Sequence, residues 1–325
     1  MPAGSDRLLH SGLRVYNRRP PLPHGAPLSR TTPLPDEARP AARGDRIRAL
    51  LLGLLPHHAL SRLTLWATRR RTRLKNPVAR WFARHYGADM DAAIERDPAA
   101  YPTFNAFFTR ALRAGMRPLE GDERVPVSPV DGRVSQAGRI RAGRLLQAKG
   151  VDYSLDDLVG GDAADAEPFR TGWFATLYLA PGDYHRIHMP LAGQVRRMCH
   201  VPGRLYSVAP WTVTTVPGLF TRNERVFVHC DTDRGPVGIV LVGAINVAAI
   251  ETVWHGLVTP PRGRWTTHTE YGAAGPRLDR GAELGRFNMG STVIVLTPPD
   301  LALDAVPPAG ATVRLGRRLG GSDGR

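Results

Sequence analysis

Residues 238–254, with the sequence GIVLVGAINVAAIETVW, form an apolar stretch that is rich in β-branched residues. Val, Ile and Thr favour strands because their branched side chains pack well on a pleated surface. Similar short stretches lie on both sides of it, namely FATLYLA, VRRMCHV, RVFVHC and STVIVLT, and Gly, Pro and Asp separate them. Short strands between turn residues are typical of antiparallel sheets. The sequence therefore predicts a β-rich, mostly antiparallel domain over residues 116–325.

The region before this domain has a helical pattern instead. Residues 46–115 hold apolar clusters at helical spacing, broken into short pieces by Gly53 and Pro56. A helix in this region is expected to bury Val78, Trp81, Phe82 and Tyr86. Arginines beside Leu and Trp are typical of helices in a membrane interface, although a helical subdomain packed on the core fits equally well. The expected fold class is α+β, with N-terminal amphipathic helices before the β-rich, mostly antiparallel domain.

Residues 1–45 are rich in Arg and Pro and contain few periodic apolar positions. Such a segment buries too little apolar surface to offset its ordering entropy, so we expect it to be disordered. The whole chain has a formal charge of +15, from 44 Lys and Arg against 29 Asp and Glu, which favours an anionic partner. No aromatic interleaving supports nucleic acid, and no apolar stretch is long enough to span a membrane.

Two separate stretches offer a carboxylate and a hydroxyl. SPVDGRVSQAG, residues 128–138, places Asp131 before a glycine, and the same pattern is common in hairpin turns. GRFNMGSTVIVLT, residues 285–297, places Ser291 at the start of a strand and directly after Gly290. It matches neither the GxSxG nucleophile elbow nor a phosphate-binding loop. Each stretch alone is also explained by an ordinary turn.

A third stretch, YHRIHMP, contains His185 and His188. A zinc site is one reading, but we find no well-placed third ligand and no HExxH, so no metal is expected. Two structural histidines are another reading, and a general base is the third. With Asp131 and Ser291, His188 completes the residue types of a triad, in which imidazole takes the hydroxyl proton and carboxylate orients the imidazole. A serine hydrolase and a non-catalytic β-rich binding module remain open on this evidence.

Several long stretches together resemble the bacterial membrane-associated phosphatidylserine decarboxylases. They follow the order of that family from about residue 46 to about residue 298, and Met289 stands where the family usually has Leu. The stretches are TFNAFFTRALR, SPVDGRVSQAG, LLQAKGVDYSLDDLVGG, LYLAPGDYHRIHMPLAG, HVPGRLYSVAPWTV, LFTRNERV, LVGAINVAAIETVW, TPPRGRW and GRFNMGSTVI.

The resemblance implies a proenzyme that cleaves itself between Gly290 and Ser291. His188, oriented by Asp131, is the expected base for the attack of Ser291 on the carbonyl of Gly290. Ser291 is then expected to become a covalent pyruvoyl group, at which the amine of phosphatidylserine forms a Schiff base. His185 is expected to assist decarboxylation or the protonation that gives phosphatidylethanolamine.

The resemblance also suggests the partners. The two cleavage fragments would form a heterodimer, and a homodimer of such pairs is favoured. The basic helices would bind an anionic phospholipid membrane, so we expect a peripheral protein on the cytoplasmic face of the cell membrane. Arg222 and Arg225 are candidates for binding the substrate. A pyruvoyl-dependent decarboxylase of a soluble amino acid is a further alternative, against which the apolar, basic helices argue.

Overall fold

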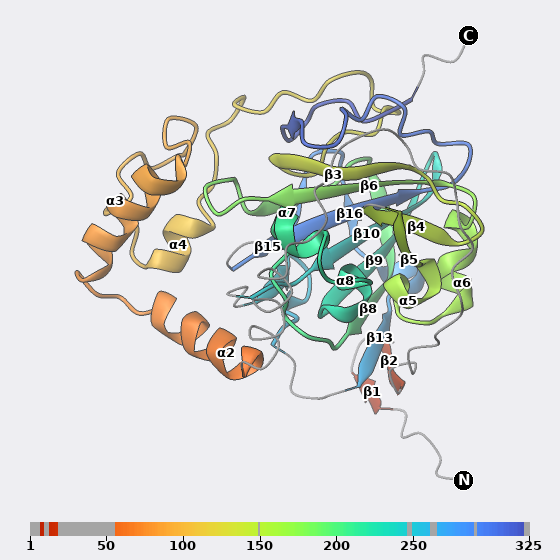
Figure 1. Cartoon of the computed structure of the whole chain (residues 1–325), viewed down its shortest axis with the longest axis horizontal. Helices are drawn as coiled ribbons and strands as arrows, with labels where there is room; N and C mark the ends of the chain where they lie inside the picture. Colours follow the sequence, from red (N-terminus) through yellow and green to blue (C-terminus); the bar gives the residue numbers. More distant parts are fainter. Residues whose placement is uncertain are drawn as a thin grey trace.

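A large antiparallel sheet forms the centre of the molecule in this computed structural model (Figure 1). The structure describes residues 7–9, 13–18, 56–148, 150–245, 249–260, 265–288 and 291–321. Within them the strand order is β1-β2-β13-β8-β9-β10-β16-β6-β3-β17, and β14 pairs with β8. The bounds are β1 Arg7–Leu9, β2 Leu13–Arg18, β3 Gly132–Arg139, β6 Trp173–Leu179, β8 Gly193–Val201, β9 Arg225–Thr232, β10 Gly235–Val242, β13 Thr266–Glu270, β14 Arg277–Leu278, β16 Ser291–Thr297 and β17 Thr312–Val313.

A second, smaller sheet carries His188 of the YHRIHMP stretch, and His185 directly precedes its strand β7. Its strand order is β12-β11-β15-β7, and a separate hairpin joins β4 to β5. The bounds are β7 Arg186–His188, β11 Ile250–Thr252, β12 Gly256–Leu257, β15 Glu283–Phe287, β4 Arg144–Ala148 and β5 Val151–Ser154. Short helices are α5 Leu155–Val159, α6 Ala163–Ala166, α7 Pro210–Val213 and α8 Leu219–Arg222, with single 3-10 turns η1 Glu167–Phe169 and η2 Gly272–Ala274.

The central strands β10 and β16 are buried on both faces. Ile239, Val240 and Leu241 are fully buried in succession, and so are Val293, Ile294 and Val295. Successive side chains of a strand point to opposite faces, so the sheet must be covered on both sides. Helices α5 to α8 lie over one face in Figure 1. This double cover explains why the sequence of these strands is continuously apolar rather than alternating.

The helical region has a small core of its own. The helical region consists of α2 (His57–Thr68), α3 (Lys75–Tyr86) and α4 (Phe104–Phe108), at the left of Figure 1. The core residues are Ala79, Phe82, Ala83, Phe104, Phe107 and Phe108. The expected burial of the α3 face was therefore right for Phe82 and wrong for Val78, Trp81 and Tyr86, which are 50%, 52% and 42% exposed. Among the described residues, only one narrow face of α3 is buried, because α4 is a short helix.

The predicted α+β fold class, with N-terminal helices before an antiparallel β-rich domain, is confirmed. Within the tail that was expected to be disordered, residues 7–9 and 13–18 form strands instead, because β2 extends the sheet by pairing with β13. The rest of residues 1–45, and residues 46–55, lie outside the described residues. In the part of the chain that is described, no helix is long and apolar enough to cross a membrane.

Candidate active site

The predicted cleavage segment connects β15 of the smaller sheet to β16 of the large sheet. The segment opposite it connects β10 of the large sheet to β11 of the smaller one. β10 and β16 are paired up to Val242 and Thr292, and pairing resumes in the smaller sheet between Ile250 and Phe287. Beside this break the amide of Asn288 donates to the carbonyl of Ala249 at 2.8 Å. Met289 and Gly290 lie outside the described residues, as do residues 246–248 on the opposite segment. The backbone of Ser291 begins β16 and pairs with Leu179 of β6.

Asp131 lies one residue before β3, close to this segment. β6 lies between β3 and β16, so Gly132 and Ser291 flank Leu179 from opposite sides. Two strand spacings amount to about 10 Å between their backbones. The carboxylate of Asp131 is buried and accepts from Nε of Arg117 at 3.0 and 3.1 Å, from Nη2 of Arg117 at 2.6 Å and from the amide of Leu315 at 2.9 Å. Its partners are therefore a guanidinium and a backbone amide.

His188 ends β7 and is held at both ring nitrogens. Nδ1 lies 2.8 Å from the carbonyl oxygen of Gly281, and Nε2 lies 3.0 Å from the hydroxyl of Tyr184. A carbonyl only accepts, so Nδ1 carries the hydrogen and Nε2 accepts from Tyr184. Burial lowers the pKa of His188, while the hydrogen bond to Gly281 and the charges of Glu283 and Asp131 oppose this shift. The ring is accordingly neutral near pH 7, with its basic atom at Nε2.

Asp131 and His188 lie near each other without a hydrogen bond between their side chains. The amide of His188 donates to the carbonyl of Pro129 at 2.9 Å, two residues before Asp131. The charge of Asp131 raises the pKa of His188, although it is a smaller influence than burial. The expected orienting contact on Nδ1 is thus made here by Gly281, and Asp131 acts on the imidazole through its charge.

His185 lies in a dry environment three residues earlier. It is fully buried and stacks on Phe108, with ring centroids 4.1 Å apart and planes at 15°. Nε2 lies 3.4 Å from the carbonyl of Pro181, and Nδ1 has no hydrogen-bond partner among the described residues. Burial, with the charge of Arg110, lowers the pKa of His185 to about 3. Its backbone carbonyl accepts from the amide of Phe287 at 3.0 Å, so this histidine lies beside the segment that leads to Ser291.

The two arginines proposed to bind substrate differ. Arg225 is buried, and it donates to the carbonyls of Leu158, Asp157, Thr221 and Asn223. These bonds use its guanidinium inside the fold, so we no longer consider it a substrate ligand. Arg222 is exposed, and its Nη2 lies 3.2 Å from the hydroxyl of Tyr206. Its charge remains accessible, and it stays a candidate.

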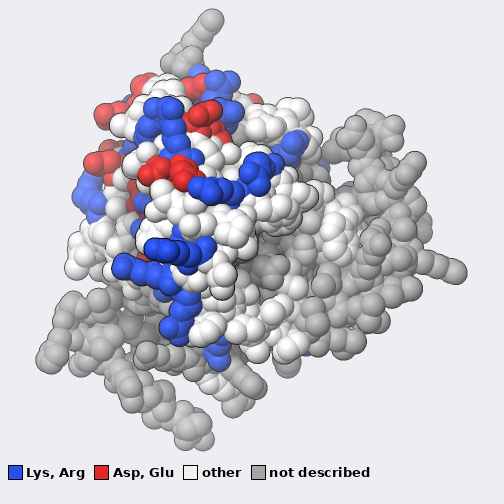
Figure 2. Space-filling view, turned by 90° about the vertical axis from the view of Figure 1, so that its left-hand side faces the viewer, with Lys and Arg blue, Asp and Glu red and all other residues white. Residues whose placement is uncertain are grey.

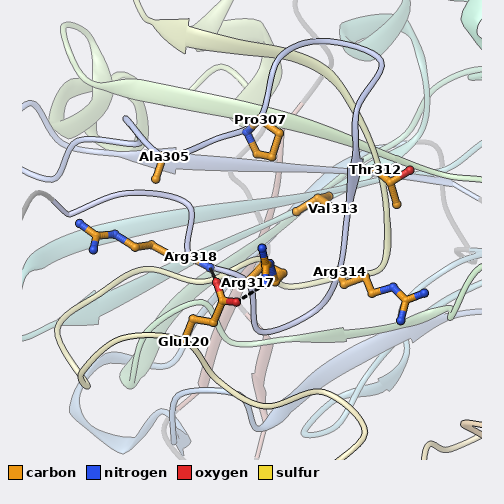
Figure 3. Close-up of a pocket in the computed structure, with 8 residues that line it drawn as sticks. All are labelled: Glu120, Ala305, Pro307, Thr312, Val313, Arg314, Arg317 and Arg318. Atoms are coloured by element: carbon orange, nitrogen blue, oxygen red, sulfur yellow. Dashed lines mark hydrogen bonds and ion pairs between the residues drawn. The ribbon is translucent and has the colours of Figure 1, made fainter.

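Two surface pockets lie near β17, on the side of the Asp131 loop. The larger one, about 490 Å³, is lined by Glu120, Ala305, Pro307, Thr312, Val313, Arg314, Arg317 and Arg318. Figure 3 shows Arg317 bonded to Glu120 while Arg314 and Arg318 point to opposite sides, so these arginines do not converge on one ligand. The smaller pocket, about 160 Å³, is lined by Arg110, Arg117, Asp131, Asp183 and Tyr184 among others. Only this smaller pocket touches a predicted catalytic residue.

A cluster with metal-ligand chemistry lies elsewhere in the described part of the molecule. Asp162, Asp165 and His268 each place one ligand atom within 4.8 Å of the others. Nη1 of Arg197 lies 2.9 Å from Oδ1 of Asp165, so a fixed positive charge already compensates this carboxylate. Neither His185 nor His188 belongs to this cluster, and we assign no metal to it.

Sequence reasoning missed the residues that hold the predicted ones. Arg117 holds Asp131, Tyr184 bonds to His188, and Asn105 of α4 donates to Oδ1 of Asn288 at 2.9 Å. Tyr184 adjoins His185 in the YHRIHMP stretch, so its hydroxyl was a signal that could have been used. Arg117 and Asn105 carry no such signal, because they are separate from their partners in the sequence and come close to them only in the folded chain.

Comparisons with known proteins place these residues in a family. The sequence model of phosphatidylserine decarboxylase matches residues 104–321, and a second model, described as PSD, matches residues 47–87. A phosphatidylserine decarboxylase proenzyme of Alkalilimnicola ehrlichii is 56% identical over 259 residues, covering 79% of this chain and 90% of that protein. Proenzymes of the same name from Pseudomonas fluorescens Pf-5 and Pseudomonas aeruginosa LESB58 are 54% and 53% identical, covering 82% and 85% of this chain and 94% and 96% of theirs.

Proposed function

The chain belongs to the phosphatidylserine decarboxylase family, and we propose that its activity depends on a pyruvoyl group made from its own Ser291. Membership makes it a phosphatidylserine decarboxylase. The observation that supports the proposal is the pairing of β7 with β15, together with the bond from the amide of Phe287 to the carbonyl of His185, because both link the histidine stretch to the strand that precedes Ser291. The name proenzyme, which its relatives bear, agrees with a chain that must be cut before it acts.

In the first stage we assign the proton transfers to His188. The hydroxyl of Ser291 attacks the carbonyl carbon of Gly290 as His188 takes the hydroxyl proton. The peptide bond is exchanged for an ester when His188 returns this proton to the departing nitrogen of Ser291, which becomes a free amine. The neutral imidazole donates from Nδ1 to the carbonyl of Gly281, so its basic atom is Nε2. This atom can accept the proton of Ser291 once its hydrogen bond with the hydroxyl of Tyr184 is broken. The charge of Asp131 stabilises the protonated ring. Removal of the Cα proton of residue 291 then expels the carboxylate of Gly290, and hydrolysis of the resulting dehydroalanine releases ammonia.

For the second stage, the residues at the junction fit a pyruvoyl group. When present, the group supplies a ketone that captures the substrate amine and accepts the electrons left by loss of CO₂. Nδ1 of His185 is buried without a partner among the described residues, so no hydrogen bond inside the described fold uses it. Stacking on Phe108 excludes water from one face of the imidazole. We assign His185 to assist decarboxylation and the protonation that follows it.

We also propose that the helical region docks on an anionic membrane surface. Leu63, Trp66, Leu74 and Trp81 on and between α2 and α3 are 59%, 57%, 80% and 52% exposed. Figure 2 shows basic side chains running down this face, whereas acidic ones gather in its upper half. The guanidinium of Arg70 lies 4.4 Å from the ring centroid of Trp66, so charge and apolar surface share one side. Such a surface suits a lipid interface, with aromatics in the headgroup layer.

Mass spectrometry of the purified protein tests the cleavage. We expect two fragments, residues 1–290 and 291–325, with a pyruvoyl mass at the start of the second. Ser291→Ala should leave one intact chain without decarboxylase activity. An intact wild-type chain that decarboxylates phosphatidylserine would contradict the pyruvoyl proposal. An intact chain that hydrolyses esters would favour a serine hydrolase.

Co-sedimentation with vesicles tests the docking surface. The double variant Trp66→Ser/Trp81→Ser should bind vesicles of anionic phospholipid at least tenfold more weakly than the wild type. Leu119→Ser is the matched control, since Leu119 is 40% exposed and lies outside the helical region. Equal binding by the wild type and the double variant would refute the docking surface.

A further inference from the structure

Helix α4 lies in the TFNAFFTRALR stretch, of which the proposed mechanism uses only the ring of Phe108. The helix begins at Thr103, whose hydroxyl accepts from the amide of Ala106 at 3.0 Å. Residues three apart lie on the same helix face, so Asn105 and Phe108 point to one side. Both contact the candidate active site, although α4 belongs to the helical region and not to either sheet.

Asn105 contacts the cleavage segment itself. Its Nδ2 donates to Oδ1 of Asn288 at 2.9 Å, and Asn288 is fully buried two residues before Gly290. Asn288 is held from the other side by Ala249, whose carbonyl accepts from its backbone amide at 2.8 Å. Nδ2 of Asn288 also lies 3.5 Å from a carboxylate oxygen of Glu251, and that same oxygen lies 3.5 Å from Arg69 at the end of α2. The helical region thus fixes the last described residue before the predicted cut.

Phe108 contacts the histidine of the second stage. Its ring is 1% exposed and lies parallel to His185, so it occupies one face of the imidazole. The residues after α4 fasten this contact to the loop before β7. Nη2 of Arg110 donates to the carbonyl of Gly182 at 2.9 Å, and Nε of Arg186 donates to the carbonyl of Thr109 at 2.9 Å.

We propose that α4 supplies one positioning residue to each stage of the reaction, Asn105 for self-cleavage and Phe108 for decarboxylation. Asn105 holds the backbone before Gly290 in place, which matters because attack on a carbonyl requires a fixed geometry of the reacting atoms. Phe108 shields the imidazole of His185 from water and holds the ring in one orientation. The inference rests on the proposed function for its kinetic effects, whereas the contact of Phe108 with His185 can be tested without it.

The first test measures how fast freshly synthesised precursor splits. Asn105→Leu keeps the side-chain volume and removes the hydrogen bond, and we expect about a tenfold slower cleavage, the effect of one buried hydrogen bond lost at the reacting segment. Thr103→Ala is the matched control, because it weakens the start of α4 and keeps both contacts. Equal slowing by Thr103→Ala and Asn105→Leu at equal loss of Tm would overturn the role of Asn105. Asn105→Leu should add nothing further to Asn288→Ala.

The second test uses Phe108→Leu and the matched control Phe107→Leu, which removes a buried ring that packs on Phe82 and Phe104. Phe108→Leu should split within about twofold of the wild-type rate and lower kcat for decarboxylation about tenfold. In the Ser291→Ala precursor, NMR titration should show the pKa of His185 raised by Phe108→Leu and unchanged by Phe107→Leu. Arg110 is the charged group that acts on His185, and both variants retain it.

These outcomes distinguish a failure of the proposed function from a failure of the roles assigned to α4. A wild-type chain that never splits defeats the proposed function, and the titration in the Ser291→Ala precursor still tests the contact. A wild-type chain that splits normally, with Phe108→Leu and Phe107→Leu alike in kcat and in the titration of His185, defeats the inference for Phe108 alone.

Discussion

His185 and His188 are three residues apart in one short stretch, yet their surroundings have little in common. His185 is fully buried against Phe108 and leaves Nδ1 without a partner among the described residues. His188 is partly buried and bonded at both nitrogens, to Gly281 and Tyr184. An anchored ring with a defined tautomer suits a base, whereas a dry ring with an open nitrogen suits contact with a substrate. The difference supports the proposal that one motif serves two separate steps.

The largest effect is expected from the anchored histidine. His188→Ala removes the base for self-cleavage, and general-base catalysis typically contributes a factor of about 100 to 10,000. We expect precursor to accumulate, with cleavage slowed at least about a hundredfold. Gel electrophoresis of the precursor over several days measures this rate. Cleavage at the wild-type rate would mean that His188 is not the base.

The dry histidine should give the opposite pattern. His185→Ala should still split, within a fewfold of the wild-type rate, because Tyr184, Gly281 and His188 keep their contacts. Decarboxylation by the split protein should fall by about a hundredfold, measured as release of CO₂ from phosphatidylserine. Accumulation of intact precursor, as in His188→Ala, would show that His185 is also needed for self-cleavage.

A smaller effect should appear in stability. The pKa of His185 is about 3 in the folded chain and about 6.5 when unfolded, so between these values only the unfolded chain binds the proton. Stability is therefore lost as the pH falls below about 6.5. From pH 7.5 to pH 5 the Ser291→Ala precursor should lose about 2 kcal/mol more than Ser291→Ala/His185→Gln in urea unfolding. Equal losses would mean that His185 is not buried in the neutral form.

The sequence predicted the elements better than their contacts. The apolar stretch at 238–254 indicated strands correctly, because burial on both faces of a sheet leaves a continuous apolar pattern. Arg225 was misjudged because a charged residue carries no sign of whether its guanidinium meets water or backbone carbonyls. In α3 the helical period was correct. Its exposed face carries apolar residues just as a core face does, and the sequence does not reveal that α4 is too short to cover it.

The candidate site was predicted in part. Asp131 lies near His188, and the carbonyl of His185 accepts from the amide of Phe287 in the strand before Ser291; the family resemblance rather than residue spacing gave that grouping. Their immediate partners were not predictable, since Arg117, Gly281 and Asn105 reach the site from distant parts of the chain. Long-range packing, which sets these contacts, leaves no local pattern in a single sequence.

The position of β16 has a consequence for the product of the proposed cleavage. The strand lies between β10 and β6 and is hydrogen-bonded to both, so the short fragment that starts at residue 291 forms the middle of the sheet. Breaking one peptide bond does not release it, and the native mass should stay the same. Once denatured, however, the two pieces would have to find each other by diffusion, so regaining the fold becomes dependent on concentration. The proposed cleavage would thereby turn refolding from a reaction of one chain into a reaction of two.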